Sequence, residues 1–362
     1  MRIAVDCRML EASGIGVYLR ECLAYFLDTS HEFLLFGDTA KLAPLVGERR
    51  NVEVAACDTR PFSLRELFFF PAALAKKING TDAYFSPYFN VPAGITVPVY
   101  TTIHDIIFPD RPELTSISKV GLMARMWFYR RAFRRSKTVF TVSAFSKSRI
   151  EHHLGRGTPV VVVYSCCPRY LVSSDRPGRG QKTGDILFAG NIKKHKGLAI
   201  LLRAFFAAQE CGLKNRLVIV GDKDNFRSRD EETLRELEYA DPRAVCFTGR
   251  IPDNTLKTYF TQSALLVQSS LYEGFGLPPL EAMMCGTKAL ISDIPVFREI
   301  YGDFPVVFFK PGDAGDLQEK LTDLLYDKDP ESIHLTKSLR SRYTYEKTAS
   351  SILREMAAFN HG

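Results

Sequence analysis

The sequence predicts an α/β protein made of two doubly wound domains, each containing a parallel sheet covered by helices. Three observations support this fold class. The chain has 362 residues, more than a single hydrophobic core usually holds. Short β-branched or aromatic runs alternate with longer helical patterns from one end to the other. One stretch rich in proline, glycine and charge, residues 168–184, interrupts the alternation near its middle.

The expected strands are apolar on both faces, as are strands buried inside a parallel sheet. In the first half of the chain they are residues 2–6, 32–37, 52–56, 82–87, 97–105, 138–143 and 160–164. In the second half they are residues 185–190, 217–222, 244–249, 264–270, 288–293 and 306–312. We therefore predict a first domain at 1–167, a linker at 168–184 and a second domain at 185–342. In such a protein we expect the ligand site in the cleft between the domains, at the carboxyl ends of strands.

Composition narrows the class of protein. Apolar residues make up 46% and charged residues 25%, which is ordinary for a soluble globular protein. No apolar run approaches the roughly 20 residues of a membrane span, and Met1 leads directly into a strand pattern rather than a secretion leader. The eight cysteines include no CxxC pair, which suits reduced thiols. We expect a cytoplasmic protein, whose net charge of +7 favours anionic partners such as nucleotides, membrane headgroups or nucleic acid.

The segment 270–286 has the composition of an anion-binding loop between a strand and a helix. Gly274 and Gly276 can take positive φ and let a ligand approach the backbone N–H groups closely. A helix follows, because prolines such as Pro278 and Pro279 are tolerated in a first turn. The start of this helix adds the positive end of its dipole, which suits a phosphate.

Two glutamates, Glu273 and Glu281, bracket this loop. A carboxylate can accept hydrogen bonds from two vicinal hydroxyls at once, which suits a ribose for Glu281 and a sugar for Glu273. A tight turn, with an acidic residue that favours a helix N-terminus, would explain the same residues. The local pattern leaves both interpretations open.

Other candidates follow strands of the first half. Residues 13–18 (SGIGVY) open a helical pattern from 17 to 28 and offer backbone N–H groups to an anion. Leu19 stands where a dinucleotide fingerprint requires glycine, so a structural turn explains this segment equally well. His104 and Asp105 follow the fifth strand as a polar pair, which is costly to bury unless it is hydrogen-bonded or faces a cleft. A structural histidine is the alternative.

In the second half, residues 189–197 (AGNIKKHKG) follow a strand and precede a clear helix from 198 to 211. Three lysines and a histidine would neutralise a diphosphate there, and a solvated basic loop is the alternative. Two D-x-D pairs have a spacing that can hold a metal, but their polar surroundings indicate turns without a metal. They are Asp222 with Asp224, and Asp327 with Asp329. The sequence has no HExxH, GxSxG or Walker A motif.

Residues 119–137 hold seven basic residues and no acidic one, interleaved with methionines and aromatic residues. Such a helix can meet an anionic membrane. Its amphipathic pattern is imperfect, because Arg125, Met123 and Trp127 break the division into basic and apolar sides. A helix packed on the sheet with cations near its C-terminal end explains the composition as well.

Several motifs occur together in one order. They are residues 14–18 (GIGVY), 86–90 (SPYFN), 103–105 (IHD), 142–147 (VSAFSK), 190–191 with 196–197, and 272–283 (YEGFGLPPLEAM). With them the sequence resembles the family 4 retaining glycosyltransferases of GT-B fold, nearest to the mannosyltransferase-like branch, over nearly the whole chain. The last motif, with its glutamates eight residues apart, is the most specific.

This resemblance implies catalytic roles for Glu273, beside the donor sugar, and for His104, near the sugar ring. It implies that Glu281 holds the ribose and that Lys196 neutralises the leaving diphosphate. The other implied donor-binding residues are Gly14, Gly16, Asn191, Lys193, Gly274, Phe275, Gly276 and Leu277. The implied acceptor residues are Tyr88, Phe89, Asn90 and Asp105. The resemblance also implies that the enzyme uses no metal or other cofactor and retains the anomeric configuration, with electrostatic stabilisation of the diphosphate as the main protein contribution.

One position departs from the family. Relatives often carry an arginine just before the lysine or just after the glycine, where this chain has His195 and Asn191. Lys193 or Lys194 would then supply the missing charge. Residues 343–362 look like the C-terminal helix that crosses back onto the first domain in this fold.

These inferences lead to one main hypothesis. The protein transfers a hexose or deoxyhexose, with GDP-mannose as the best single donor, to a glycan or lipid-linked acceptor in surface polysaccharide assembly. It would do so in the cytoplasm, with the basic helix as a candidate peripheral contact with the inner membrane. One alternative is a sugar-nucleotide epimerase, or a glycosidase that uses both glutamates as a carboxylate pair. Another is a non-catalytic protein that binds membrane or nucleic acid, although no nucleic-acid motif is present.

Overall fold

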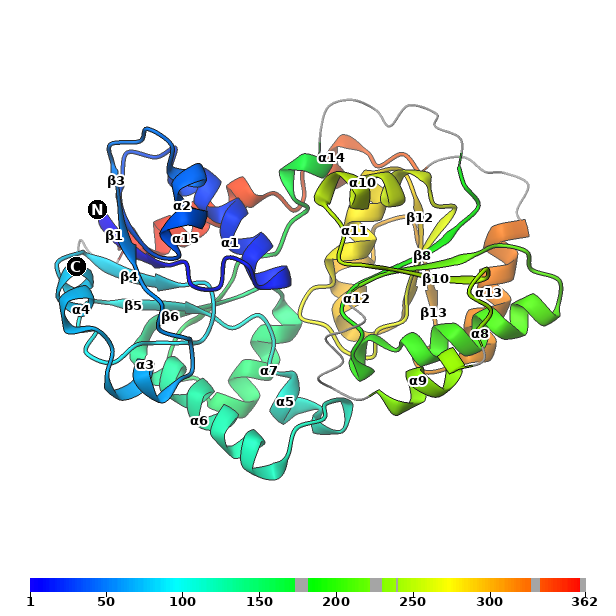
Figure 1. Cartoon of the computed structure of the whole chain (residues 1–362), viewed down its shortest axis with the longest axis horizontal. Helices are drawn as coiled ribbons and strands as arrows, with labels where there is room; N and C mark the ends of the chain where they lie inside the picture. The colour runs from blue at the N-terminus through cyan, green and yellow to red at the C-terminus, as the bar shows by residue number, and fades with distance from the viewer. Residues whose placement is uncertain (173–181, 222–229, 239, 327–332, 359–362) are drawn as a thin grey trace. The chain divides into compact units, whose positions relative to one another are not determined.

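The computed structural model describes residues 1–172, 182–221, 230–238, 240–326 and 333–358. It divides into two compact units (Figure 1). Unit 1 comprises Met1–Asp110, Ser118–Cys166 and Tyr343–Gly362, and unit 2 comprises Arg111–Ile117 and Cys167–Arg342. Each unit has its own parallel sheet and its own hydrophobic core, which confirms the predicted α/β class.

The sheet of unit 1 has seven parallel strands in the order β3-β2-β1-β4-β5-β6-β7. The strands are β1 Arg2–Asp6, β2 Glu32–Gly37, β3 Val52–Ala56, β4 Ala83–Ser86, β5 Val99–Thr102, β6 Ser136–Thr141 and β7 Val160–Val162. Each overlaps its predicted range. The order reverses between β1 and β4, so the loops that follow these two strands lie side by side at a topological switch point.

Helices cover both faces of this sheet. They are α1 Ser13–Phe26, α2 Thr39–Val46, α3 Leu64–Phe68, α4 Ala72–Asn79, α5 Ile107–Asp110, α6 Lys119–Arg135, α7 Ala144–Leu154 and α15 Tyr345–Ala358. Successive strand residues point to opposite faces: Tyr84 joins the core formed with α4, α6 and α7, whereas Phe85 packs on Phe26 of α1. α15 packs against α1. Burial on both faces explains why these strands are continuous apolar runs.

The sheet of unit 2 has six parallel strands in the order β10-β9-β8-β11-β12-β13, which reverses between β8 and β11. The strands are β8 Ile186–Ala189, β9 Leu217–Val220, β10 Val245–Gly249, β11 Leu265–Gln268, β12 Lys288–Ser292 and β13 Val306–Phe309. The helices are α8 Leu198–Glu210, α9 Glu231–Glu238, α10 Asp253–Gln262, α11 Leu277–Met284, α12 Pro295–Tyr301, α13 Ala314–Tyr326 and α14 Lys337–Arg340. α8 and α13 form a core with one face of the sheet, and α11 packs on β11 and β12 from the other side (Figure 1).

Two local predictions need comment. α1 begins at Ser13 rather than at residue 17, because the N–H of Gly16 donates to the carbonyl of Ala12 and closes an earlier helical turn. The predicted loop glycines therefore lie in the first turn of a helix.

The predicted linker is described only in part: Arg169–Leu171 forms a 3-10 turn, and residues 173–181 lie outside the described residues. None of the helices in the described part of the chain combines the length and apolar composition that crossing a bilayer requires.

Candidate functional site

Two loops meet at the switch point of unit 2. Residues 190–197 follow β8 and carry the basic cluster, and residues 269–276 follow β11 and carry the glycine-rich segment. The backbone N–H of Leu271 in the second loop donates to the carbonyl of His195 in the first at 2.7 Å. The strand order therefore brings together two motifs that lie far apart in the sequence.

Gly197 permits the close approach of these loops. Its φ is +65°, and a Cβ added there would lie 2.0 Å from the carbonyl oxygen of Ser269. The Ser269 hydroxyl in turn donates to the carbonyl of Gly197 at 2.9 Å. Only glycine fits both the backbone angle and the space, and this fit holds the preceding residue, Lys196, beside the β11 loop.

Lys196 and Glu273 form an ion pair. The ammonium lies 2.6 Å from Oε1 of Glu273, whose side chain is 8% exposed. The same Oε1 accepts a hydrogen bond from the Ser270 hydroxyl at 2.7 Å, and that hydroxyl accepts one from the Gln268 amide at 2.8 Å. Gln268 and Ser270 are fully buried, so this chain of bonds fixes the carboxylate orientation. Among the described residues none donates to Oε2, which leaves that oxygen for a ligand hydroxyl.

α11 begins directly after this loop. The residue before it, Gly276, has a φ of +82°, and a Cβ there would lie 2.4 Å from the ring of Phe297. The carbonyl of Gly276 accepts a hydrogen bond from the buried Tyr301 hydroxyl. Pro278 and Pro279 occupy the first turn of α11, as predicted. The loop and the helix start are therefore locked against α12, which carries both aromatic rings.

The N-cap residue of α11 is Gly276, which has no side chain that could cap the first turn. The positive end of the α11 dipole therefore suits an anion. Gly274 differs from the expectation, because its φ is not positive. Phe275 is buried and Leu277 is partly buried, so each contributes packing as well as backbone to this loop.

Glu281 lies in the second turn of α11 and is 9% exposed. Burial, together with the negative charge of Asp253, raises the pKa of its carboxyl to about 7. Within the described residues the carboxyl makes no hydrogen bond and no ion pair. A buried carboxyl without a donor is costly, and ligand hydroxyls would reduce that cost.

The basic loop after β8 carries its charge on lysines alone. Burial and the positive charges of Lys196 and Lys193 lower the pKa of His195 to about 2, so its ring stays neutral. Asn191, Lys193 and Lys194 are exposed. His195 therefore adds no positive charge to this loop.

In unit 1 the predicted residues gather around His104, which follows β5. Its Nε2 lies 2.8 Å from the carbonyl of Pro87, and a carbonyl can only accept, so Nε2 carries the proton. Tyr18 of α1 packs edge-on against the ring, with centroids 4.9 Å apart. Burial lowers the pKa of His104. The ring is therefore a neutral imidazole whose Nδ1 can accept a hydrogen bond.

The residues predicted for the acceptor side separate into two groups. Tyr88 lies near the His104 ring, with centroids 6.4 Å apart, and Asp105 caps the backbone N–H of Ile107 at 3.1 Å. Phe89, in contrast, is 2% exposed and packs in the core. Its position gives it a packing role, and its predicted contact with an acceptor stays a prediction.

Asn90 belongs to a buried polar network that the sequence did not reveal. Its amide donates to Asp6 at 2.8 Å and to Glu66 at 3.1 Å. The guanidinium of Arg8 bridges the same two carboxylates at 2.5 and 2.6 Å. Asp6 is the last residue of β1 and Arg8 lies in the loop that follows, so the network crosses the switch point of unit 1. It fixes the loop after β4, whose Pro87 carbonyl orients the histidine described above.

The two glycines of α1 differ in their surroundings. A Cβ at Gly16 would lie 2.2 Å from the carbonyl oxygen of Leu10, whereas Gly14 has open space around it. Close backbone packing thus explains Gly16 without a ligand. Contact of either residue with a phosphate stays a prediction.

Within the described residues no cluster of three or more His, Cys, Asp and Glu side chains is placed to hold a metal ion. The four aspartates of the two D-x-D pairs lie outside those residues.

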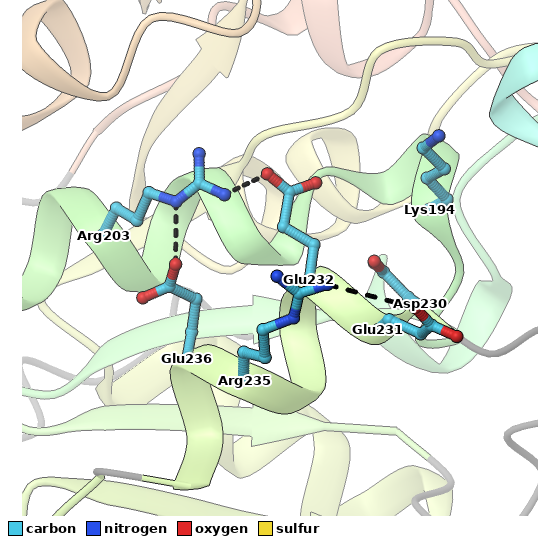
Figure 2. Close-up of a pocket in the computed structure, with 7 residues that line it drawn as sticks. All are labelled: Lys194, Arg203, Asp230, Glu231, Glu232, Arg235 and Glu236. Atoms are coloured by element: carbon cyan, nitrogen blue, oxygen red, sulfur yellow. Dashed lines mark hydrogen bonds and ion pairs between the residues drawn. The ribbon is translucent and has the colours of Figure 1, made fainter.

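A cavity of about 450 Å³ lies between α8 and α9, apart from the Glu273 loop. Figure 2 shows Arg203 of α8 reaching Glu232 and Glu236 of α9 there. These charges satisfy one another, and we assign the cavity no ligand.

The sequence matches the family model described as Glycosyl transferases group 1 over residues 157–343, just over half of the chain. The chain belongs to this family. The match contains both loops of the β8–β11 switch point and the whole of α11. The segment that contains Lys196, Glu273 and Glu281 therefore lies within the part of the chain that matches the family.

The chain is similar to mannosyltransferases of O-antigen chains. O-antigen chain mannosyltransferase B of Escherichia coli is 27% identical over 256 residues, which are 67% of this chain and 65% of the relative. O-antigen chain mannosyltransferase RfbU of Salmonella typhimurium is 25% identical over 246 residues, 68% of this chain and 65% of the relative. The matched segments thus span slightly less than two thirds of each relative's length.

The family match covers about half of this group 1 glycosyl transferase chain, whereas a similar solved structure covers nearly all of it. Sucrose-phosphate synthase from Thermosynechococcus elongatus covers 99% of both chains with a TM-score of 0.77 and 18% identity. At that identity the likeness shows the fold alone. It confirms the predicted GT-B type of two Rossmann-like domains.

Sequence reasoning missed three residues of this site. Gln268 and Ser270 hold the Glu273 carboxylate, and Asp253 contributes to the raised pKa of Glu281. A signal existed for the first two, since polar side chains at the end of an apolar strand are costly unless they are paired. None existed for Asp253, whose proximity depends on how α10 packs beside α11.

Proposed function

We propose that this protein transfers a hexose or deoxyhexose from a nucleotide-diphosphate sugar to a glycan or lipid-linked saccharide in surface polysaccharide biosynthesis. The observation that carries the proposal is the Lys196–Glu273 pair beside the N-terminus of α11, whose N-cap residue is Gly276. An ammonium, a helix N-terminus and a fixed carboxylate match the groups of a diphosphate with its attached sugar.

In the proposed mechanism the donor diphosphate binds at the start of α11 and attracts the Lys196 ammonium away from Glu273. As the bond from the anomeric carbon to the diphosphate breaks, negative charge grows on the leaving oxygen. Lys196 and the helix N-terminus stabilise that charge, which is the kind of contribution that most enzymes use to lower such a barrier. Lys193 adds positive charge on the same loop, whereas the ammonium of Lys194 donates to the carbonyl of Glu113 at 3.0 Å. No metal is required.

We assign the binding of the donor's hydroxyl groups to Glu273 and Glu281. Released from the ammonium, Glu273 offers its carboxylate to hydroxyls of the donor sugar, while Ser270 and Gln268 keep it oriented. Glu281 offers its buried carboxyl to the two ribose hydroxyls, whose O–H groups supply the donors that the carboxyl lacks.

The acceptor hydroxyl attacks the anomeric carbon on the face from which the diphosphate departs, so the anomeric configuration is retained. Its proton passes to the departing diphosphate, and no covalent enzyme intermediate is required. We assign to His104 a contact with the sugar, since the neutral ring presents Nδ1 as an acceptor. Tyr88 and Asp105 are the proposed acceptor contacts.

GDP-mannose is the proposed donor. Both relatives described above are named as mannosyltransferases of O-antigen chains. Those names favour mannose as the sugar and a growing saccharide as the acceptor. Synthesis of such chains from nucleotide sugars would place the protein in the cytoplasm.

Donor turnover tests the proposal. The protein is incubated with GDP-mannose, or with UDP and TDP sugars, in the presence and absence of a lipid-linked saccharide extract, and released nucleoside diphosphate is measured. One nucleotide sugar should be consumed with the extract present, and its sugar should appear in the saccharide. Cleavage of glycans in nucleotide-free buffer would favour the glycosidase alternative and contradict the proposal.

A further inference from the structure

Exposed apolar side chains gather on two neighbouring segments of unit 1. Among the described residues nine large hydrophobic side chains are exposed, and six of them lie on or beside α3 and α6. These six are Leu64, Phe68, Phe69, Val120, Met123 and Trp127. Phe69 is 74% exposed and Met123 is 72% exposed, so most of the surface of each residue meets water. A concentration of this kind marks an interaction surface rather than scattered surface residues.

α3 and α6 contact each other, and both donate to or accept from the backbone of the loop that contains Val91 and Ala93. The ring of Phe62, just before α3, packs on the ring of Phe128 in α6 with centroids 5.0 Å apart. The carbonyl of Glu66 in α3 accepts the N–H of Ala93 at 2.9 Å, and Arg131 of α6 donates to the carbonyl of Val91. Figure 1 shows the two helices next to each other on the same side of unit 1.

α6 has two distinct sides along its length. Tyr129, Ala132 and Phe133 point into the core. The exposed residues Val120, Met123 and Trp127 follow at the three- and four-residue spacing of one helical stripe, which Arg130 and Arg134 continue. The outer stripe is thus apolar at its beginning and cationic at its end. The imperfect amphipathic pattern noted in the sequence arises because a single helix carries both a core side and this outer stripe.

The cations of α6 are not neutralised by the protein. The helix carries Lys119, Arg125, Arg130, Arg131, Arg134 and Arg135 and no acidic residue. In the described part of the chain none of these six pairs with a carboxylate. Arg131 and Arg135 bond to backbone carbonyls, whereas Arg130 and Arg134 are exposed to solvent. The surface is therefore cationic and complementary to an anionic partner.

We propose that the α3–α6 surface, formed by these six apolar side chains with Arg130 and Arg134, docks on an anionic lipid bilayer. Exposed phenylalanine, tryptophan and methionine side chains can enter the interfacial region of a bilayer, where the cations meet anionic headgroups. The unpaired cations beside the apolar side chains are complementary to the anionic headgroups and apolar interior of such a bilayer. The proposal stands on the surface alone and does not depend on the proposed function.

Vesicle binding in the absence of nucleotide and acceptor tests this inference. The full-length protein is floated with vesicles of pure phosphatidylcholine and with vesicles that also contain phosphatidylglycerol, at low and high salt. Binding should require phosphatidylglycerol and should weaken as salt rises, because salt screens the interaction of exposed cations.

Two double variants separate the apolar and the charged parts of the surface. Phe68→Ser with Phe69→Ser should weaken partitioning by about tenfold or more, since two interfacial aromatic rings are lost. Arg130→Glu with Arg134→Glu should weaken it by at least about 25-fold, from about fivefold for each cation near an anionic surface. Tyr326→Ser and Lys214→Glu, at exposed positions of unit 2, serve as matched controls and should bind like the wild type. All of these side chains are exposed, and melting temperatures close to the wild-type value will verify folding.

Three results would overturn the inference. The first is an absence of binding to phosphatidylglycerol vesicles. The second is binding that both double variants leave unchanged. The third is a wild-type dimer, seen by light scattering, that Phe68→Ser with Phe69→Ser dissociates while no vesicles are bound, because the surface would then belong to a second copy of the chain. None of these results would alter donor turnover measured with a water-soluble acceptor, so the inference and the proposed function fail separately.

Discussion

The ammonium of Lys196 lies 2.6 Å from Oε1 of Glu273, across two loops that follow neighbouring strands. Without a ligand each residue neutralises the other. A diphosphate that binds here must therefore compete with Glu273 for the ammonium. Replacing the two residues should act on nucleotide binding in opposite directions, although both changes should impair turnover.

Glu273→Gln should lower donor turnover far more than it lowers stability. The substitution keeps the size of the side chain but removes the charge that we expect to act on the donor sugar. We expect turnover to fall by about 100-fold or more, as for loss of one preorganised electrostatic group. The melting temperature should change by less than about 4 °C, the equivalent of about 1 kcal/mol.

The matched control is Glu319→Gln, at an exposed position of α13, and should turn over donor like the wild type. Wild-type turnover by Glu273→Gln, measured as release of nucleoside diphosphate, would refute the assignment of Glu273.

The raised pKa of Glu281 predicts stability that depends on pH. Its carboxyl should release a proton near pH 4.5 in the unfolded chain and near pH 7 in the folded protein. Between these values the folded state binds more protons, so the free energy of unfolding falls as pH rises. The total fall attributable to this group is at most roughly 3 kcal/mol.

Glu281→Gln removes this titration and keeps the side-chain volume. Urea unfolding should therefore show wild-type stability declining relative to Glu281→Gln as the pH rises from 4.5 to about 7. Parallel pH profiles for the two proteins would mean that Glu281 ionises normally and is not buried as described.

Gly276→Ala should destabilise unit 2. The new Cβ would lie 2.4 Å from the Phe297 ring at a backbone φ of +82°. Strain of this kind costs about 1–3 kcal/mol, which should lower the urea midpoint. Gly157→Ala, at a glycine with open space around it, should leave the midpoint nearly unchanged. Equal midpoints for Gly276→Ala and the wild type would contradict the described conformation of the loop.

Much of the fold could be predicted from the sequence because a parallel strand buried on both faces is a continuous apolar run. The run at 264–270, for example, contains β11 at Leu265–Gln268. The start of α1 could not be predicted as well. Glycines are poor helix formers, yet Gly16 lies within the first turn because its N–H closes a bond to Ala12 and because Leu10 leaves no room for a side chain.

The sequence indicated individual residues of the candidate site but not which of them contact one another. Lys196 and Glu273 each follow a strand, which indicated a ligand-binding edge, but their pairing depends on β8 and β11 being neighbours in the sheet. Asn90 shows the opposite case. Its motif indicated a binding residue, whereas contacts with Asp6 and Glu66, distant in the sequence, make it part of a buried network.

Calorimetric titration of nucleoside diphosphates into three proteins tests the central claim most directly. GDP, UDP and TDP are titrated into the wild type, Lys196→Ala and Glu273→Gln, with Lys214→Ala as a control at an exposed lysine of unit 2. The wild type and the control should bind the preferred nucleotide equally. Lys196→Ala should bind it about 10- to 100-fold more weakly, since a charge-assisted hydrogen bond contributes about 1.5–3 kcal/mol. Glu273→Gln should bind it at least as tightly as the wild type, because the ammonium no longer has a competing partner. Equal affinity of Lys196→Ala and the wild type, or an absence of binding to all three nucleotides, would contradict the account.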